Sequence, residues 1–290
     1  MKNVIVKNAF WIVLVSFVFS TGTYAQGVID GFMTGAGKTE LALSYSHEKF
    51  SSFWKGNRLI YRDWRYITRS TSLYGSHGIT EDLDIVVNLP YISASVAGKK
   101  ATGLQDLGVY LNYRAYDMPL YRANLQVIGS FGIQQPMSRY ENTEMPYIGH
   151  RSTNVDMRAV GQYKMDNGLF AMAQMGYTLK VGPTPNTTSM VARVGYAAND
   201  YYVDAWIDKQ KGYNGTSFNE TEFYKTAMSY VGAGVTAYTR IYKGLGATLS
   251  IGSTIKGKNV GRAARLSTSV VYKFDRPEKK KTPIDMPNEI

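Results

Sequence analysis

The sequence predicts an all-β protein, specifically a twelve-stranded antiparallel transmembrane β-barrel with short periplasmic turns and long extracellular loops. Three observations predict this fold. Apolar residues alternate with polar or small ones over segments of about ten residues, which is the period of strands with two different faces. Beyond residue 19, no stretch of about 18 apolar residues could form a spanning helix, although 44% of all residues are hydrophobic and 23 are tyrosine. The N-terminus has the pattern of an export signal.

Residues 1–25 are predicted to be a cleaved signal peptide. Lys2 and Lys7 precede an apolar stretch at 9–19, and residues 23–25 (Thr-Tyr-Ala) form a small-x-small cleavage site. The alternative, a single membrane anchor, needs about 20 apolar residues and is disfavoured because this stretch is much shorter. We therefore expect the mature protein to begin near Gln26 and to be exported to the cell outer membrane.

The composition excludes several classes of function. The chain has no cysteine, which rules out disulfides, thiolate catalysis and thiolate metal sites. Its formal net charge of +11 comes from residues that are scattered rather than clustered, so a nucleic-acid partner is not expected. No histidine pair has metal-ligand spacing, and no cofactor or metal site is predicted. The expected surroundings are outer-membrane lipid and a small-molecule solute of unknown identity.

The strands are predicted from one recurring hairpin pattern, which is clearest at 72–94. After the turn at 80–82, residues Leu83, Ile85 and Val87 share one face and polar or small residues occupy much of the other. Repeating this pattern along the chain gives a barrel over residues 26–274. Its twelve strands are expected near 40–46, 63–79, 83–91, 106–115, 122–134, 155–163, 169–179, 190–196, 201–207, 227–237, 247–255 and 262–274.

The connections between these strands alternate between short turns and long loops. The pair Asn167-Gly168 is a strong signal for a tight hairpin, whereas 136–153 and 209–224 are long and polar. This alternation and the even number of strands are typical of bacterial outer-membrane barrels, with both termini on the periplasmic side. Tyrosines near the short turns fit an aromatic girdle. A soluble β-sandwich or a lipocalin-like fold is the alternative.

Residues 275–290 follow the last predicted strand and have no hydrophobic periodicity. They contain three prolines, and their charges cancel. We interpret them as a disordered periplasmic tail. Such a tail, beginning after Phe274, is also the candidate binding segment for another protein of the cell envelope.

The region from Ser72 to Pro136 carries a further pattern: a Tyr-Gly hairpin before Leu-Pro-Tyr, a strand that starts with Gly-x-x-Asp, and a later strand that ends near proline. The residues that carry this pattern are Tyr74, Gly75, Leu89, Pro90, Tyr91, Gly103, Asp106 and Pro136. This region resembles a family of predicted outer-membrane barrel transporters that is often labelled "meta-pathway of phenol degradation". The family's compact Gly-x-Gly-Asp stands here as Gly-Leu-Gln-Asp at 103–106. The resemblance implies a transporter of small hydrophobic or aromatic solutes.

The strand faces opposite the apolar ones are predicted to line the lumen. Arginine that faces lipid at the bilayer midplane costs about 2–4 kcal/mol, so charged residues of the strands are placed inside. The candidates for the lumen lining are Arg65, Arg69, Asp106, Arg114, Arg122, Asp156, Arg158, Arg193, Asp204, Arg240 and Arg265. A lumen lined mainly by basic residues would favour anions. Alternatively, an Arg–Asp network could fill and brace a barrel of this size.

These features favour a passive channel for small solutes, which the resemblance implies to be hydrophobic or aromatic. The first alternative is a non-conducting structural or assembly barrel that binds another envelope protein through its loops or its tail. An outer-membrane hydrolase is the remote alternative. The chain has only three histidines, His47, His77 and His150, and lacks a Gly-x-Ser-x-Gly motif. Nucleophilic catalysis needs a base beside its serine, so we predict that the protein is not an enzyme.

Overall fold

The computed structural model describes residues 29, 31–216 and 222–274. The predicted signal peptide and the predicted tail lie outside these ranges. Among the residues that are described, no helix is long and apolar enough to cross a membrane.

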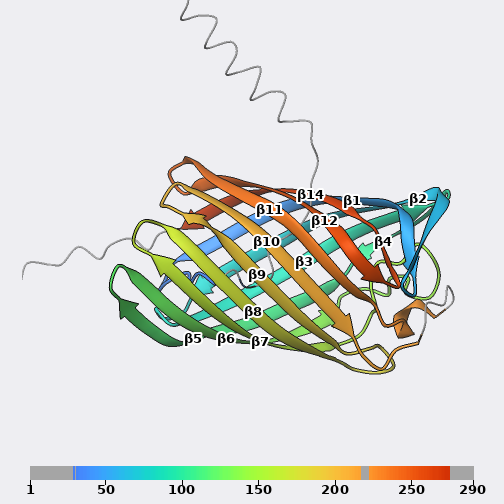
Figure 1. Ribbon diagram of the computed structural model, residues 1–290, viewed down its shortest axis with the longest axis horizontal. Helices are drawn as coiled ribbons and strands as arrows, with labels where there is room; N and C mark the ends of the chain where they lie inside the picture. Colours follow the sequence, from blue (N-terminus) through green and yellow to red (C-terminus); the bar gives the residue numbers. More distant parts are fainter. Residues whose placement is uncertain (1–28, 30, 217–221, 275–290) are drawn as a thin grey trace, which may run out of the picture.

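The chain forms one closed antiparallel sheet (Figure 1). Segment β4 continues into β5 and β13 into β14, so fourteen strand segments make twelve barrel strands, and β1 closes the barrel by pairing with both β2 and β14. The predicted fold class and strand number are confirmed. The elements are β1 (Thr39–Lys55), β2 (Arg58–Gly78), β3 (Leu83–Val96), β4 (Lys99–Leu104), β5 (Asp106–Leu120), β6 (Ala123–Pro136), β7 (Asn154–Met165), β8 (Leu169–Lys180), β9 (Thr187–Ala197), β10 (Tyr201–Gly212), the 3-10 helix η1 (Phe223–Lys225), β11 (Ser229–Tyr242), β12 (Leu245–Lys258), β13 (Val260–Gly261) and β14 (Ala264–Phe274).

The alternation of the sequence separates an apolar outer face from a polar inner face. On β1, Ser44 and Ser46 are buried inside the barrel, whereas Leu41 and Leu43 are exposed on its outside. Leu43 pairs with Leu73 of β2 and with Val270 of β14, which are also exposed. Exposed apolar rows of this kind are the outer surface expected of a barrel surrounded by lipid.

The two ends of the barrel differ. At one end, here called the turn end, the connections are short, and at the other, the loop end, they include two long loops. The turn-end connections are 79–82, 121–122, 166–168, 198–200 and 243–244. The loop-end connections include 56–57, 97–98, 137–153, 181–186 and 213–228. Long loops are therefore not present at every loop-end hairpin.

The first hairpin extends much farther than the sequence predicts. The first predicted strand ends at residue 46 and the second begins at residue 63, but β1 and β2 remain paired as far as Lys55 and Arg58. Gly56 supplies the positive φ of +58° in the tight turn between them. In Figure 1 this hairpin projects at the loop end beyond the neighbouring strands.

Candidate channel lumen

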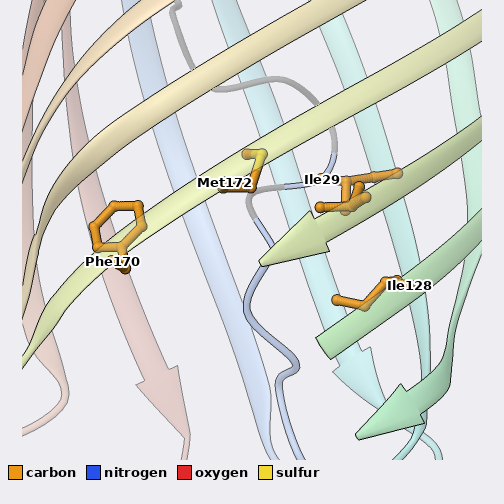
Figure 2. Close-up of a cluster of buried hydrophobic side chains, with 5 residues drawn as sticks. Ile29, Ile128, Phe170 and Met172 are labelled. Atoms are coloured by element: carbon orange, nitrogen blue, oxygen red, sulfur yellow. The ribbon is translucent and has the colours of Figure 1, made fainter. Parts of the chain in front are cut away.

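The chain before β1 lies inside the barrel, and we call residues 29 and 31–38 the inner segment. Ile29, which is 3% exposed, packs against Ile128 of β6, Val160 of β7, and Phe170 and Met172 of β8. Figure 2 shows Ile29 among these wall residues, with the chain running on through the interior. The inner segment thus occupies part of the lumen.

An aromatic cluster continues this contact toward the turn end. The ring of Phe32 lies edge-on to Phe170, with 5.5 Å between ring centroids, and edge-on to Tyr202 of β10 at 6.1 Å. The ammonium group of Lys164 lies 5.5 Å from the centroid of Phe32. Edge-to-face aromatic pairs and cation–π contacts each contribute about 0.5–1.5 kcal/mol. The inner segment is therefore held to the wall by specific contacts.

Hydrogen bonds fix the end of the inner segment that leads into β1. The Thr34 N–H donates to Asp84 Oδ2 at 2.7 Å, and the Gly37 N–H donates to the Gly78 carbonyl at 2.7 Å. The Gly78 N–H donates to the Lys38 carbonyl at 3.0 Å. A Cβ at position 78 would overlap the Gly35 carbonyl, so only glycine permits this close approach of the two backbones.

The inner segment has no strand periodicity, so its place inside the barrel could not be predicted from the alternation pattern. One signal could have revealed it. The apolar residues Ile29, Phe32 and Met33 are interspersed with glycines immediately after the predicted cleavage site. An exposed periplasmic extension would not need apolar side chains at this density.

A chamber lined by both apolar and charged side chains lies between the inner segment and the wall at the turn end. It has a volume of about 410 Å³. Lys38, Lys164 and Lys273 line it together with the carboxylates Glu40 and Asp84. Lys273 Nζ lies 2.9 Å from Glu40 Oε2. We refer to this space as the turn-end chamber.

Most of the predicted lumen residues that lie inside the barrel form ion pairs there. Arg158 binds both oxygens of Asp156, at 2.8 and 2.7 Å, in a bidentate pair. The buried Arg193 and Asp204 lie 3.0 Å apart, and the Tyr202 hydroxyl also donates to Asp204. Two further inward residues have equally specific partners: Arg265 binds Glu48 at 2.8 Å, and Asp106 accepts from the Tyr140 hydroxyl at 2.5 Å.

Arg114 and Arg240 lie at the rim of the turn end rather than within the lumen. Arg114 binds Asp82 at 2.6 Å and Asp117 at 3.3 Å. Arg240 lies 3.1 Å from Asp200 and donates to the Asn199 carbonyl at 2.7 Å. Both arginines therefore tie a short turn to the strand beside it.

The prediction that Arg65, Arg69 and Arg122 line the lumen is wrong. Arg65 and Arg69 are exposed on the outside of β2, next to residues Tyr66 and Ser70, which are buried inside. A strand needs only about 9–11 residues to cross the bilayer, and β2 has 21, so an outward arginine need not face the hydrocarbon. Arg122 lies in the exposed turn 121–122, above the ring of Tyr121.

At the loop end, the two long loops meet over the barrel. The rings of Tyr147 from one loop and Phe223 from the other stack with 3.7 Å between centroids, and His150 stacks on Phe223 at 5.4 Å. The Tyr66 hydroxyl donates to the Tyr147 carbonyl at 2.7 Å, which ties the first loop to β2. Phe50 of β1 stacks on Tyr66 at 4.9 Å.

These rings enclose a pocket of about 240 Å³, here called the aromatic pocket. It is lined chiefly by Phe50, Trp64, Tyr66, Tyr147, His150 and Phe223. Glu48, the partner of Arg265, also lines it, so the pocket adjoins the inward-facing ion pair of β1 and β14. No sequence signal identified this pocket, because its walls come from the first hairpin and from two loops far away in the chain.

The three histidines lie in separate places. His47 belongs to the outward row of β1, His77 contacts Thr39 near the turn end at 2.8 Å, and His150 belongs to the 137–153 loop. Within the described ranges, no group of three or more His, Asp or Glu side chains could hold a metal ion. The structure therefore brings no histidines together into a candidate catalytic or metal centre.

The closed twelve-stranded antiparallel wall, which surrounds two chambers and paired internal charges, has the fold of solved outer-membrane β-barrels. The COG4313 outer membrane channel from Pseudomonas putida F1 superimposes with a TM-score of 0.73 at 14% identity, over 87% of this chain and 100% of that one. The KdgM porin in complex with disordered oligogalacturonate gives a TM-score of 0.50 at 12% identity, over 81% and 99% of the two chains. No family model and no curated protein matches the sequence. The resemblance to the phenol-degradation family therefore stays a prediction.

Proposed function

We propose that this protein is a passive channel in the outer membrane for small hydrophobic or aromatic solutes, and that it is not an enzyme. The observation that carries the proposal is the aromatic pocket at the loop end. Solute pockets are concave and mostly apolar, with a few polar groups that fix orientation. This pocket combines stacked rings with Glu48 and His150 in its lining. Its position beside an inward-facing ion pair supports a role as the site where solute enters the barrel.

The test is single-channel recording of the refolded mature protein, with an uncharged aromatic compound such as naphthalene added on the loop side. We expect openings that the compound interrupts. The variants Trp64→Ala and Phe50→Ala should weaken this block, and Leu43→Ala on the outer face should not. Steady conductance with no effect of aromatic compounds would refute the solute class while leaving the channel itself supported.

The inner segment favours a second candidate, the non-conducting structural barrel. An occupied lumen is what a barrel that serves only as a scaffold would have. In that case protein that is shown to be folded by its heat-shifted gel mobility would give no openings. An envelope protein would instead co-purify with it, and truncation after Phe274 would abolish the association.

We propose that the net positive charge of the lumen is confined to the turn-end chamber. The arginines deep in the barrel are paired with carboxylates, so they contribute little net charge. The turn-end chamber, by contrast, contains three lysines and two carboxylates among its lining residues. We therefore assign any preference for anions to this chamber.

A further inference from the structure

The outer surface of the first four strand segments carries basic side chains that the channel function does not use. We define the cationic patch as Lys49 on β1, Arg69 on β2 and Lys100 on β4, all of which are exposed. Lys49 pairs with Ile67, Ile67 with Ser95, and Ser95 with Lys100, so these four residues form one row across β1 to β4. Arg69 lies in the next row toward the turn end.

The register sets the spacing of this patch. Arg69 is the diagonal neighbour of Lys49, and such neighbours have Cα atoms about 7–8 Å apart. Lys100 lies three strands from Lys49, which is about 14 Å at the usual strand spacing. His47, the direct partner of Arg69, adjoins the patch. Flexible lysine and arginine side chains could therefore contact one polyanionic group together.

The rows of this surface change in character toward the loop end. Leu43, Leu73 and Leu89 form an apolar row. In the next row Tyr45 pairs with Thr71, and Thr71 with Tyr91. The patch follows immediately after. This order of hydrocarbon-like, aromatic and cationic rows is the profile of a membrane interface, where acyl chains give way to charged headgroups.

Within the described residues, no carboxylate forms an ion pair with the patch. Among the ion pairs of the described residues, none includes Lys49, Arg69 or Lys100. The outward positions of these rows also hold no aspartate or glutamate. The contrast with the lumen is sharp, because the arginines there bind carboxylates. Charges left uncompensated at an interface attract anions from their surroundings.

We propose that the cationic patch binds the phosphate groups of a phosphorylated glycolipid in the outer leaflet, with its acyl chains on the apolar row below. Lysine and arginine are the residues that bind phosphate, arginine through two parallel hydrogen bonds. The spacing of the patch fits a headgroup with more than one phosphate. The patch lies toward the loop end, where the first hairpin projects beyond the neighbouring strands (Figure 1). In outer-membrane barrels the long loops are extracellular, so the lipid that meets the patch belongs to the outer leaflet.

The test is binding of bisphosphorylated lipid A to the purified full-length mature protein in neutral detergent, measured by native mass spectrometry. Phosphatidylglycerol, dephosphorylated lipid A and inorganic phosphate are the comparison ligands. One surface cation contributes about fivefold in affinity for an anionic lipid. We therefore expect Lys49→Gln/Arg69→Gln to bind lipid A about 25-fold more weakly.

The matched control is Arg122→Gln/Lys243→Gln, which removes the same charge from exposed turns at the opposite end. It should bind lipid A like the wild type, and so should the charge-preserving Lys49→Arg/Arg69→Lys. Heat-shifted gel mobility verifies folding of every variant. Equal binding by Lys49→Gln/Arg69→Gln and the wild type would overturn the proposal. Equal binding of phosphatidylglycerol, or full competition by inorganic phosphate, would overturn the assignment to an outer-leaflet glycolipid.

Discussion

Arg193 and Asp204 form the most deeply buried ion pair of the barrel, with side chains 1% and 0% exposed. Arg193 projects inward from β9 and Asp204 from β10, and the Tyr202 hydroxyl donates to the same carboxylate oxygen as Arg193, Oδ2, at 2.6 Å. An ion pair that is taken out of water is stable only when each charge keeps its partner. This pair therefore acts as an internal brace between two neighbouring strands.

Breaking this pair should destabilise the barrel strongly. Arg193→Met leaves a buried unpaired carboxylate, which costs about 3–5 kcal/mol of unfolding free energy. The double variant Arg193→Met/Asp204→Leu removes both charges and should lose much less. Urea unfolding in micelles measures both, with Arg65→Met on the exterior as a control that changes stability by at most about 0.5 kcal/mol. Equal losses for the single and double variants would contradict the brace.

His150 makes the loop-end closure sensitive to acid. Burial, and secondarily the charge of Lys180, lower the pKa of His150 from 6.5 to about 3, while a backbone hydrogen bond at Tyr224 acts in the opposite direction. His150 binds its proton more readily in the unfolded state than in the folded one. Neutral His150 therefore stabilises the folded loop end fully above pH 6.5, and this contribution is lost as the pH falls toward 3.

We expect binding of an aromatic compound to the pocket, followed by Trp64 fluorescence, to weaken between pH 6.5 and 5. His150→Phe keeps a ring on Phe223 and should bind equally at both pH values. Hydrogen bonds from Thr143 lower the pKa of Glu141, in the same loop, to about 2, so that group titrates in stronger acid. A pH dependence that persists in His150→Phe would contradict the assignment of the effect to His150.

The inner segment is the element that occupies part of the interior of this barrel. It follows the wall from Ile29 to Lys38 and is held by an apolar cluster, an aromatic cluster and backbone hydrogen bonds to Gly78. Because it occupies lumen cross-section, its removal should widen the path for ions. Its described residues form only an isolated bridge, between Ala36 and Gly78 of β2, so its placement depends mainly on the wall that surrounds it.

Gly78→Ala should release the end of the inner segment, because a Cβ there overlaps the Gly35 carbonyl. We expect single-channel conductance to rise severalfold, as it should on deletion of residues 29–34. Gly129→Ala is the matched control, since a Cβ at that position meets no atom within 4 Å. Unchanged conductance in the folded deletion variant would show that the inner segment does not limit the pore.

At the scale of the whole molecule, charge is distributed unevenly along the barrel. Ion pairs neutralise the centre, three lysines gather in the turn-end chamber, and the loop end is aromatic. A path through the barrel would therefore select by charge at one end and by ring contacts at the other. The two selections are physically separate and can be altered independently.

Neutralising the chamber should change ion selectivity. Lys38→Gln/Lys164→Gln removes two of its three lysines and should lower the anion-to-cation permeability ratio below that of the wild type, because cations then meet a smaller barrier. Reversal potentials in a salt gradient measure this ratio. Lys209→Gln, on the outside of β10, is the control and should leave it unchanged. An unaltered ratio in the chamber variant would place selectivity elsewhere.

The strand number and the inner and outer faces could be predicted because they depend on local pattern. Alternation with a period of two sets which side chains share a face, and the Asn167-Gly168 pair alone specifies a tight turn. The same reasoning placed Asp156, Arg158 and Arg193 on the inner face. The position of Arg69 was predicted wrongly because the whole of β2 was taken to lie within the hydrocarbon. The full length of that strand could not be read from the sequence around Arg69.

The sequence by itself determined the fold class of this protein, because each strand carries its own two-faced pattern and a closed barrel is the arrangement that satisfies all of them in lipid. Only the tertiary structure decided what fills and borders that barrel. Ile29 contacts Met172, and Tyr66 of β2 donates to the Tyr147 carbonyl in the loop over it. Both contacts join residues far apart in the chain. Such contacts depend on strand register and closure, which no local pattern encodes.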